Sequence, residues 1–296
     1  MRTLYVLLFV LINFSFALAH DLKHLPLGDN LKSDEPKIGY IWPCHIETNA
    51  GGAFKDGPWL NADGTTYDRT KKPIVSGDVK WPHVFKITLE DDKRIFATND
   101  LPDHGTGVFP IAEDSEAYQY DRNPNGIKKQ KFSFSLPANP QLAAQPSCAP
   151  GAVGIMLSGV SQFSAIDAPG RDAPAHELQD RCNGHPQVTG AYHYHNLSPC
   201  LNDVKQADGS SGLLGYAVDG FGIYGPLAAG GKRLDSKDLD ECHGITSMIK
   251  WDGRRMNMYH YVATDDFPYT VGCMRGKPDM KVMQILSGPR PGWFNF

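Results

Sequence analysis

Two histidines that alternate with tyrosines are the residues of this chain best suited to chemistry. Tyr192-His193-Tyr194-His195 has the alternation of a short β-strand, in which successive side chains point to opposite faces. His193 and His195 would therefore share one face, where two imidazoles can converge on a single ion. The tetrapeptide indicates a metal-binding surface more clearly than it indicates any reaction.

Residues upstream of the tetrapeptide extend this candidate site. Glu177 and Asp180 lie three positions apart, so on a helix they would share a face, and His185 follows them. Imidazole nitrogens and carboxylate oxygens suit transition metals, of which zinc or copper is our first expectation. We predict His185, His193 and His195 as ligands, with Glu177 or Asp180 as a fourth ligand or as the carboxylate that orients a histidine. Their ring nitrogens must then lie within about 5 Å of one another.

The same histidines also have a purely structural explanation. Buried histidines need hydrogen-bond partners, so His193 and His195 could be strand residues satisfied by Asp180, Asp219 or backbone carbonyls. The tyrosines of the motif are typical of core or cross-strand packing and need no catalytic role. The metal site and this structural reading both remain open at the level of sequence.

Short strands joined by turns must position these residues. Gly (30) and Pro (22) are abundant and long heptad patterns are absent. Alternating polarity predicts strands at 84–89 and 131–136, and Asp219-Gly220 predicts a tight hairpin turn within residues 214–224. Good helix formers predict a helix within residues 172–181. The expected fold class is mostly β with short helices.

A sequence pattern recurs once along the chain. D-x-C-x-G…YHY…C begins at Asp180 and again at Asp240, which suggests two related structural units packed together. In the second copy Val262 stands where His195 stands in the first, so we do not expect a second, symmetric metal site.

The six cysteines fit an oxidising compartment, although an even count alone allows 15 pairings. The repeat suggests that each unit is closed by its own bridge, Cys182–Cys200 and Cys242–Cys273. Cys44–Cys148 would then form the third disulfide.

The N-terminus has the features of a secretory signal. An apolar run ends in Ala17-Leu18-Ala19, the small-x-small pattern of a cleavage site, so we assign residues 1–19 to a signal peptide and 20–37 to a polar arm. Residues 38–296 read as a single domain, with two intimately packed subdomains as the alternative. Cleavage would leave His20 first, and an N-terminal histidine can bind copper through its amine and imidazole, though the following residues do not resemble enzymes of that kind.

Composition narrows the classes of partner. The chain of 296 residues carries a formal net charge of -4, which gives no basic patch for nucleic acid. After the signal no segment is long and apolar enough to span a bilayer, so we expect a secreted, extracellular or periplasmic protein. Motifs of serine hydrolases, nucleotide-binding enzymes and HExxH zinc peptidases do not occur.

The chain resembles the YHYH domain family, which is named for the tetrapeptide. The resemblance runs from about Ser76 to Gly276. It is carried by the segments 99–107, 177–185, 192–195, 215–226, 240–244 and 259–261. It implies a secreted or exported protein and no settled activity.

Together these features support a secreted, disulfide-braced protein with a histidine-rich metal site. Metal-assisted hydrolysis or oxidation of an extracellular substrate is the natural enzymatic expectation, because a bound ion polarises a carbonyl or activates water. The contrasting expectation is a non-catalytic extracellular binding or structural module.

Overall fold

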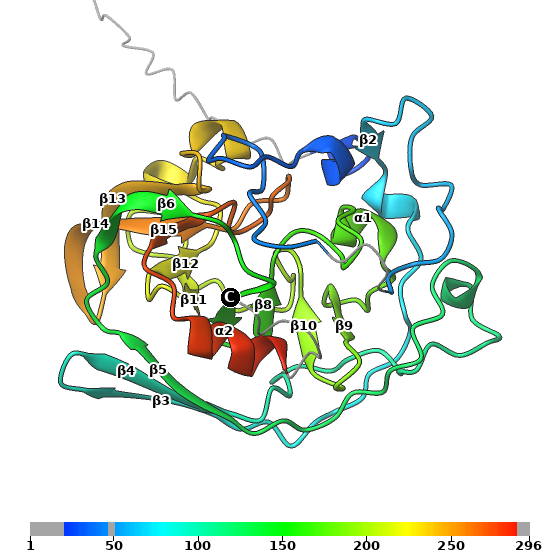
Figure 1. The fold of residues 1–296 in the computed structure, drawn as a ribbon, viewed down its shortest axis with the longest axis horizontal. Coiled ribbons are helices and arrows are strands. Elements are labelled where there is room, and N and C mark those ends of the chain that lie inside the picture. The colour runs from blue at the N-terminus through cyan, green and yellow to red at the C-terminus, as the bar shows by residue number, and fades with distance from the viewer. Residues whose placement is uncertain (1–20, 47–50, 289–296) are drawn as a thin grey trace, which may run out of the picture.

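An eight-stranded sheet occupies the centre of the computed structural model, which describes residues 21–46 and 51–288. The strand order is β13-β14-β12-β11-β7-β8-β10-β9, and the sheet runs across the molecule in Figure 1. Its strands are β7 (Ala152–Met156), β8 (Ser161–Phe163), β9 (Gly184–Pro186), β10 (Tyr192–Tyr194), β11 (Leu213–Ala217), β12 (Gly222–Tyr224), β13 (Gly244–Trp251) and β14 (Arg254–Val262).

The two halves of this sheet repeat one arrangement in opposite order. Each half has an antiparallel hairpin, β7–β8 or β11–β12, whose second strand pairs in parallel with β10 or β14. The outermost strand, β9 or β13, then pairs antiparallel with that strand. β7 and β11 join the halves along the middle. This confirms the expectation of a β-rich fold built from two related units.

The aspartate of each repeat closes its turn in the same way. Asp180 Oδ1 accepts hydrogen bonds from the backbone N–H groups two and four residues later, and Asp240 Oδ1 does the same. The Tyr192 hydroxyl donates to Asp180, and the Tyr259 hydroxyl donates to Asp240. A Cβ atom at Gly184 would overlap the Tyr192 ring, so only glycine allows this approach. The D-x-C-x-G pattern therefore encodes a turn that is held by a tyrosine of β10 or β14, the strand paired with the one that follows the turn.

The remaining elements surround the central sheet. A three-stranded sheet, β3 (Phe85–Glu90), β4 (Lys93–Thr98) and β5 (Phe132–Pro137), lies below it in Figure 1, and α2 (Met280–Ser287) contacts β7 and β5. Two smaller sheets have two antiparallel strands each. One pairs β1 (Leu25–Pro26) with β2 (Thr66–Tyr67), and the other pairs β6 (Leu142–Ser147) with β15 (Met274–Gly276). The other helices are α1 (Ala173–His176) and the 3-10 turns η1 (Gly28–Asn30), η2 (Arg69–Lys71), η3 (Ala117–Gln119), η4 (Ala229–Gly231) and η5 (Ser236–Asp238).

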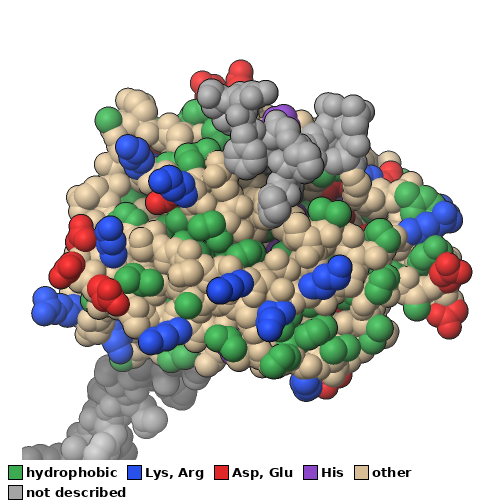
Figure 2. All heavy atoms as spheres, turned by 60° about the horizontal axis from the view of Figure 1, so that its bottom comes forward, with side chains coloured by type: hydrophobic (Ala, Val, Ile, Leu, Met, Phe, Trp, Pro, Cys, Tyr) green, Lys and Arg blue, Asp and Glu red, His purple; other side chains and the backbone are tan. Residues whose placement is uncertain are grey.

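The face that carries the three-stranded sheet is mixed in character. Figure 2 brings this face forward and shows Lys and Arg side chains scattered among hydrophobic ones, with acidic side chains between them and at the edges. Val84 and Leu89 are more than half exposed. The visible face has no continuous patch of one charge.

Three disulfides brace the fold with the pairing that the repeat suggested. Cys182–Cys200 and Cys242–Cys273 each close one unit, and Cys44–Cys148 joins distant parts of the chain. In the described part of the chain, no helix has the length and apolar character needed to cross a bilayer.

Two expectations about chain segments change with the structure. The helix predicted within 172–181 is a single turn, α1. It begins after the N-cap Asp172 and ends at Glu177, whose backbone angles of φ -77° and ψ 137° are extended. Residues 25–31 of the predicted arm pack onto the body, since Leu25 is fully buried and the Gly28 N–H donates to Asp172. The signal peptide assigned to 1–19 and the residue His20 lie outside the described residues.

Candidate metal centre

Three histidine side chains converge at the β9–β10 end of the central sheet. His185 and His193 are directly opposite each other in the antiparallel pair, and His195 follows β10 by one residue. One ring nitrogen from each of the three lies within 4.8 Å of the others, and all three side chains are buried. The two tyrosines of the motif point to the other face, as the alternation predicts, where the Tyr194 hydroxyl contacts His104 Nε2 at 2.5 Å.

The hydrogen bonds of His193 and His195 indicate their tautomers. His193 Nδ1 contacts the Ala191 carbonyl at 3.3 Å, and His195 Nδ1 contacts the Ser164 carbonyl at 2.6 Å. A carbonyl oxygen only accepts, so both Nδ1 atoms carry the proton and a neutral ring presents a lone pair at Nε2. The two Nε2 atoms are only 3.1 Å apart. Either a proton shared by the two nitrogens or a cation bound by both is compatible with this separation.

Glu177 supplies a buried carboxylate to the same cluster. Its Oε2 lies 3.5 Å from His185 Nε2 and 3.5 Å from His195 Nε2, and its side chain is 12% exposed. Burial raises the pKa of Glu177 well above its ordinary value, and the charges of Asp167 and Asp121 raise it further. Within the described residues Oε2 has no hydrogen-bond partner. A cation beside this oxygen would offset the cost of burying the charge.

The spacing of these atoms matches a coordination shell. Bonds of about 2.0–2.1 Å to a tetrahedral zinc ion separate the ligand atoms by roughly 3.3–3.4 Å. Three of the six separations among the four Nε2 and Oε2 atoms are 3.1, 3.5 and 3.5 Å, and one ring nitrogen of each histidine lies within 4.8 Å of the others. Burial lowers the pKa of His185 well below its ordinary value, and the neighbouring His195 adds to this. His185 is therefore neutral, which is the state that binds a metal.

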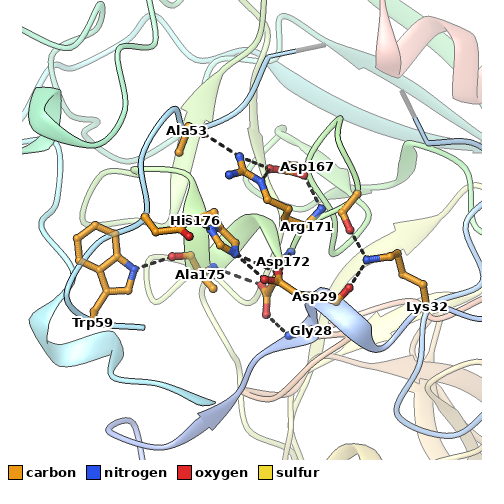
Figure 3. A network of polar contacts seen from close by, with 12 residues as sticks. Gly28, Asp29, Lys32, Ala53, Trp59, Asp167, Arg171, Asp172, Ala175 and His176 are labelled. Carbon is orange, nitrogen blue, oxygen red and sulfur yellow. Dashed lines mark hydrogen bonds and ion pairs between the residues drawn. The ribbon is translucent and has the colours of Figure 1, made fainter. Parts of the chain in front are cut away.

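A polar network surrounds α1, the turn directly before Glu177 (Figure 3). His176 Nδ1 contacts Asp56 at 3.0 Å and its Nε2 contacts Asp29 at 3.0 Å. Burial disfavours the charged ring, but Asp29 outweighs it and the pKa of His176 is raised. Lys72 Nζ donates to the carbonyls of Pro174 and Glu177, and burial together with Arg69 lowers the pKa of Lys72 to about 8. The backbone on both sides of the Glu177 side chain is thus held in place.

The structure does not bring Asp180 into this cluster. Its two oxygens accept from the turn that it closes, from the Gly107 N–H at 2.9 Å and from the Tyr192 hydroxyl. Burial raises its pKa despite these hydrogen bonds. The expectation that Glu177 and Asp180 share a helix face is wrong, because the chain is extended between them. Asp219 is equally engaged elsewhere, since it accepts from the Tyr261 hydroxyl at 2.6 Å, so the fold places neither acid beside the histidines.

The corresponding position in the second unit has no such cluster. His260 occupies the place of His193, but Ile245 pairs with it where His185 pairs with His193. Val262 then follows in the place of His195. Burial lowers the pKa of His260 to about 4. The shared fold therefore forms without metal ligands, and the three-histidine cluster belongs to the first unit alone.

Two contacts at the cluster were not found from the sequence. The Ser164 carbonyl orients His195, and the Phe163 ring packs on His193 with centroids 4.1 Å apart. In the second unit Tyr224 contacts His260 from the corresponding strand position, but its ring is edge-on, with centroids 4.9 Å apart. His104, Cys182 and Cys200 form another compact group, but the two sulfurs are joined in a disulfide and cannot act as thiolate ligands.

Comparison with known families agrees with the tetrapeptide. The model of a family described as YHYH protein matches residues 133–237, a segment that contains all four members of the cluster. No curated protein and no solved structure matches the chain. Residues 133–237 of the chain are therefore similar to the YHYH family.

Proposed function

We propose that this protein binds one divalent transition-metal ion, zinc in the first instance, through His185, His193, His195 and Glu177. The observation that carries the proposal is the 3.1 Å separation of the His193 and His195 Nε2 atoms, whose Nδ1 atoms both face carbonyl oxygens. Neutral rings in this arrangement direct two lone pairs at one point. The buried carboxylate of Glu177 adds a negative charge at the same place.

The second unit supports a functional role for the ion over a purely structural one. It builds the same four-strand arrangement with Ile245 and Val262 in place of two of the histidines. A metal is therefore not required to hold this type of unit together. Glu177 is also the most exposed member of the cluster, so its position is the one that a substrate or water can exchange.

We infer Lewis-acid chemistry as the reaction class, with hydrolysis of an extracellular substrate as its simplest form. Zinc polarises a carbonyl or lowers the pKa of a bound water. Its three imidazoles would stay in place while Glu177 accepts or returns a proton. Secretion is part of this proposal and is supported by the three disulfides.

Metal analysis of matched variants tests the binding proposal. Purified protein is loaded with zinc, dialysed and analysed for zinc per chain. We expect about one ion in the wild type and in His260→Ala, which alters the equivalent histidine of the other unit. His193→Ala and His195→Ala should each lose most of the ion. Equal, negligible zinc in all four proteins would support instead the non-catalytic module in which the histidines only pack.

Activity is tested separately on the loaded protein. Chromogenic esters and amides are offered to zinc-loaded wild type, to the dialysed metal-free form and to Glu177→Gln. Turnover that needs both zinc and Glu177 is expected. A wild type that holds zinc and hydrolyses none of these compounds would contradict the hydrolytic part and leave metal binding intact.

A further inference from the structure

A small cavity lies beside the candidate metal centre, on the outer side of the loop that carries Glu177. Its volume is about 60 Å³, and its wall includes Arg69, Lys72, Gln179, Asp180, Asn183 and Asn196. Gln179 follows Glu177 by two residues, and Asn196 follows His195 directly. The cavity is distinct from the cluster because none of the four proposed metal ligands lines it.

Two buried amide side chains in this wall have unused hydrogen-bonding atoms. Gln179 is 5% exposed and Asn196 is 4% exposed. Gln179 Nε2, a donor, and Asn196 Oδ1, an acceptor, have no hydrogen-bond partner within the described residues. Burying such a group unpaired costs about 1–3 kcal/mol. A ligand in the cavity that accepts from the first and donates to the second would recover this cost.

The wall also contains two cationic side chains. The Lys72 ammonium group donates to two backbone carbonyls, which are neutral acceptors. Within residues 21–46 and 51–288, the structure places no carboxylate in an ion pair with the half-buried Arg69. Asp180 is the acid of the wall, but its oxygens already accept from the turn, Gly107 and Tyr192. The donors of the wall that remain for a ligand are thus cationic or amide N–H groups.

We propose that this cavity binds a small oxyanion that also carries a hydroxyl group, such as hydrogen phosphate or an α-hydroxycarboxylate. Its oxygens would accept from Arg69, Lys72 and Gln179 Nε2, and its hydroxyl would donate to Asn196 Oδ1. The volume equals that of a few water-sized spheres, which suits one such ion and excludes larger molecules.

This anion site does not depend on the proposed metal ion. All four groups that would hold the anion come from outside the metal cluster, so metal-free protein should bind it as well. Arg69 also lines a larger groove of about 580 Å³ with Leu197, Pro199 and Leu201. Arg69 is thus shared by the small cavity and this groove.

Calorimetric titration of metal-free wild type tests the chemistry of the ligand. The probes are inorganic phosphate, sulfate, glycolate and acetate at pH 7. We expect phosphate to bind about tenfold more tightly than sulfate, and glycolate more tightly than acetate, because only the first of each pair has a hydroxyl for Asn196. A stronger signal for phosphate or for glycolate identifies which of the two ion classes fits. Equal binding of each pair, or binding of none of the four, would overturn the proposal.

Variants then test the location. Arg69→Ala should weaken binding of the preferred ion about tenfold, and Gln179→Glu should abolish it by placing a like charge in the cavity. Lys71→Ala is the matched control, because this neighbouring lysine is 66% exposed and pairs with Asp68. Zinc content and thermal unfolding of each variant show that it is folded. Anion binding that survives in folded Arg69→Ala and Gln179→Glu would place the ion elsewhere and refute the site.

Discussion

Replacing Glu177 by glutamine should have opposite effects on stability with and without a metal ion. In the metal-free protein the Glu177 carboxylate is buried, its Oε2 lacks a hydrogen-bond partner within the described residues, and burial raises its pKa. Glu177→Gln removes the ionisable group, and with it the cost of burying an acid, at nearly constant volume. In the metal-bound protein the same change removes a negatively charged ligand from the ion.

The expected sizes follow from these contacts. Removing this buried acid should stabilise the metal-free protein by about 1 kcal/mol or more. Loss of an outer partner of a metal ligand already weakens metal binding 10–100-fold, so loss of a ligand should cost at least roughly 1.4–2.8 kcal/mol. The sign of the stability change should therefore reverse when zinc is added.

Urea unfolding measured by circular dichroism, on dialysed and zinc-loaded protein, gives both values. Glu177→Gln should raise the midpoint of the metal-free protein and lower that of the zinc-loaded one relative to wild type. The reasoning fails if the variant destabilises both forms equally, because Glu177 would then be an ordinary packing residue. It also fails if zinc does not stabilise the wild type.

Four further substitutions test the scaffold. Tyr192→Phe should lower the free energy of unfolding in urea by about 2 kcal/mol, since the Tyr192 hydroxyl donates to a buried carboxylate. Tyr259→Phe should lower it by about 1 kcal/mol, because its hydrogen bond is less buried. Zinc content should not change in either variant, and loss of zinc would contradict the structural role. Cys182→Ser opens a disulfide with a sequence separation of 18 and should cost about 3 kcal/mol, and no change in the urea midpoint would refute the bridge. Burial raises the pKa of Asp172 to about 7 from 3.8, so the folded state binds more protons than the unfolded state between these values. Its contribution to stability is complete below pH 3.8 and is lost as the pH rises to 7, a change on the order of 4 kcal/mol. The free energy of unfolding of Asp172→Asn should therefore vary less with pH than that of the wild type. Identical pH profiles would contradict this.

Local patterns predicted much of the scaffold. Alternation placed the histidines and tyrosines on opposite faces of β10, and Asp219-Gly220 forms the β11–β12 turn with Gly220 at φ 92°. The repeated D-x-C-x-G pattern led to the disulfide pairing, because a repeated motif implies a repeated closure. Each of these features is decided by neighbours in sequence or by one short repeat.

The composition of the site could be predicted only in part. Glu177 and Asp180 look equivalent in a helical pattern, but α1 ends after one turn at Glu177, whose backbone is extended, so the two acids diverge. Which acid meets the histidines depends on His176, whose partners Asp29 and Asp56 lie more than a hundred residues away. The cavity beside the site was missed for the same reason, since its walls meet only in the folded chain.

X-ray absorption at the zinc edge of the loaded protein tests the proposed centre most directly. The three-histidine cluster predicts four nitrogen or oxygen neighbours at about 2.0–2.1 Å, with the outer scattering of three imidazole rings and no sulfur. That pattern should disappear in His195→Ala and persist in His260→Ala. A shell of five or six oxygens without imidazole, or a sulfur neighbour at about 2.3 Å, would contradict it.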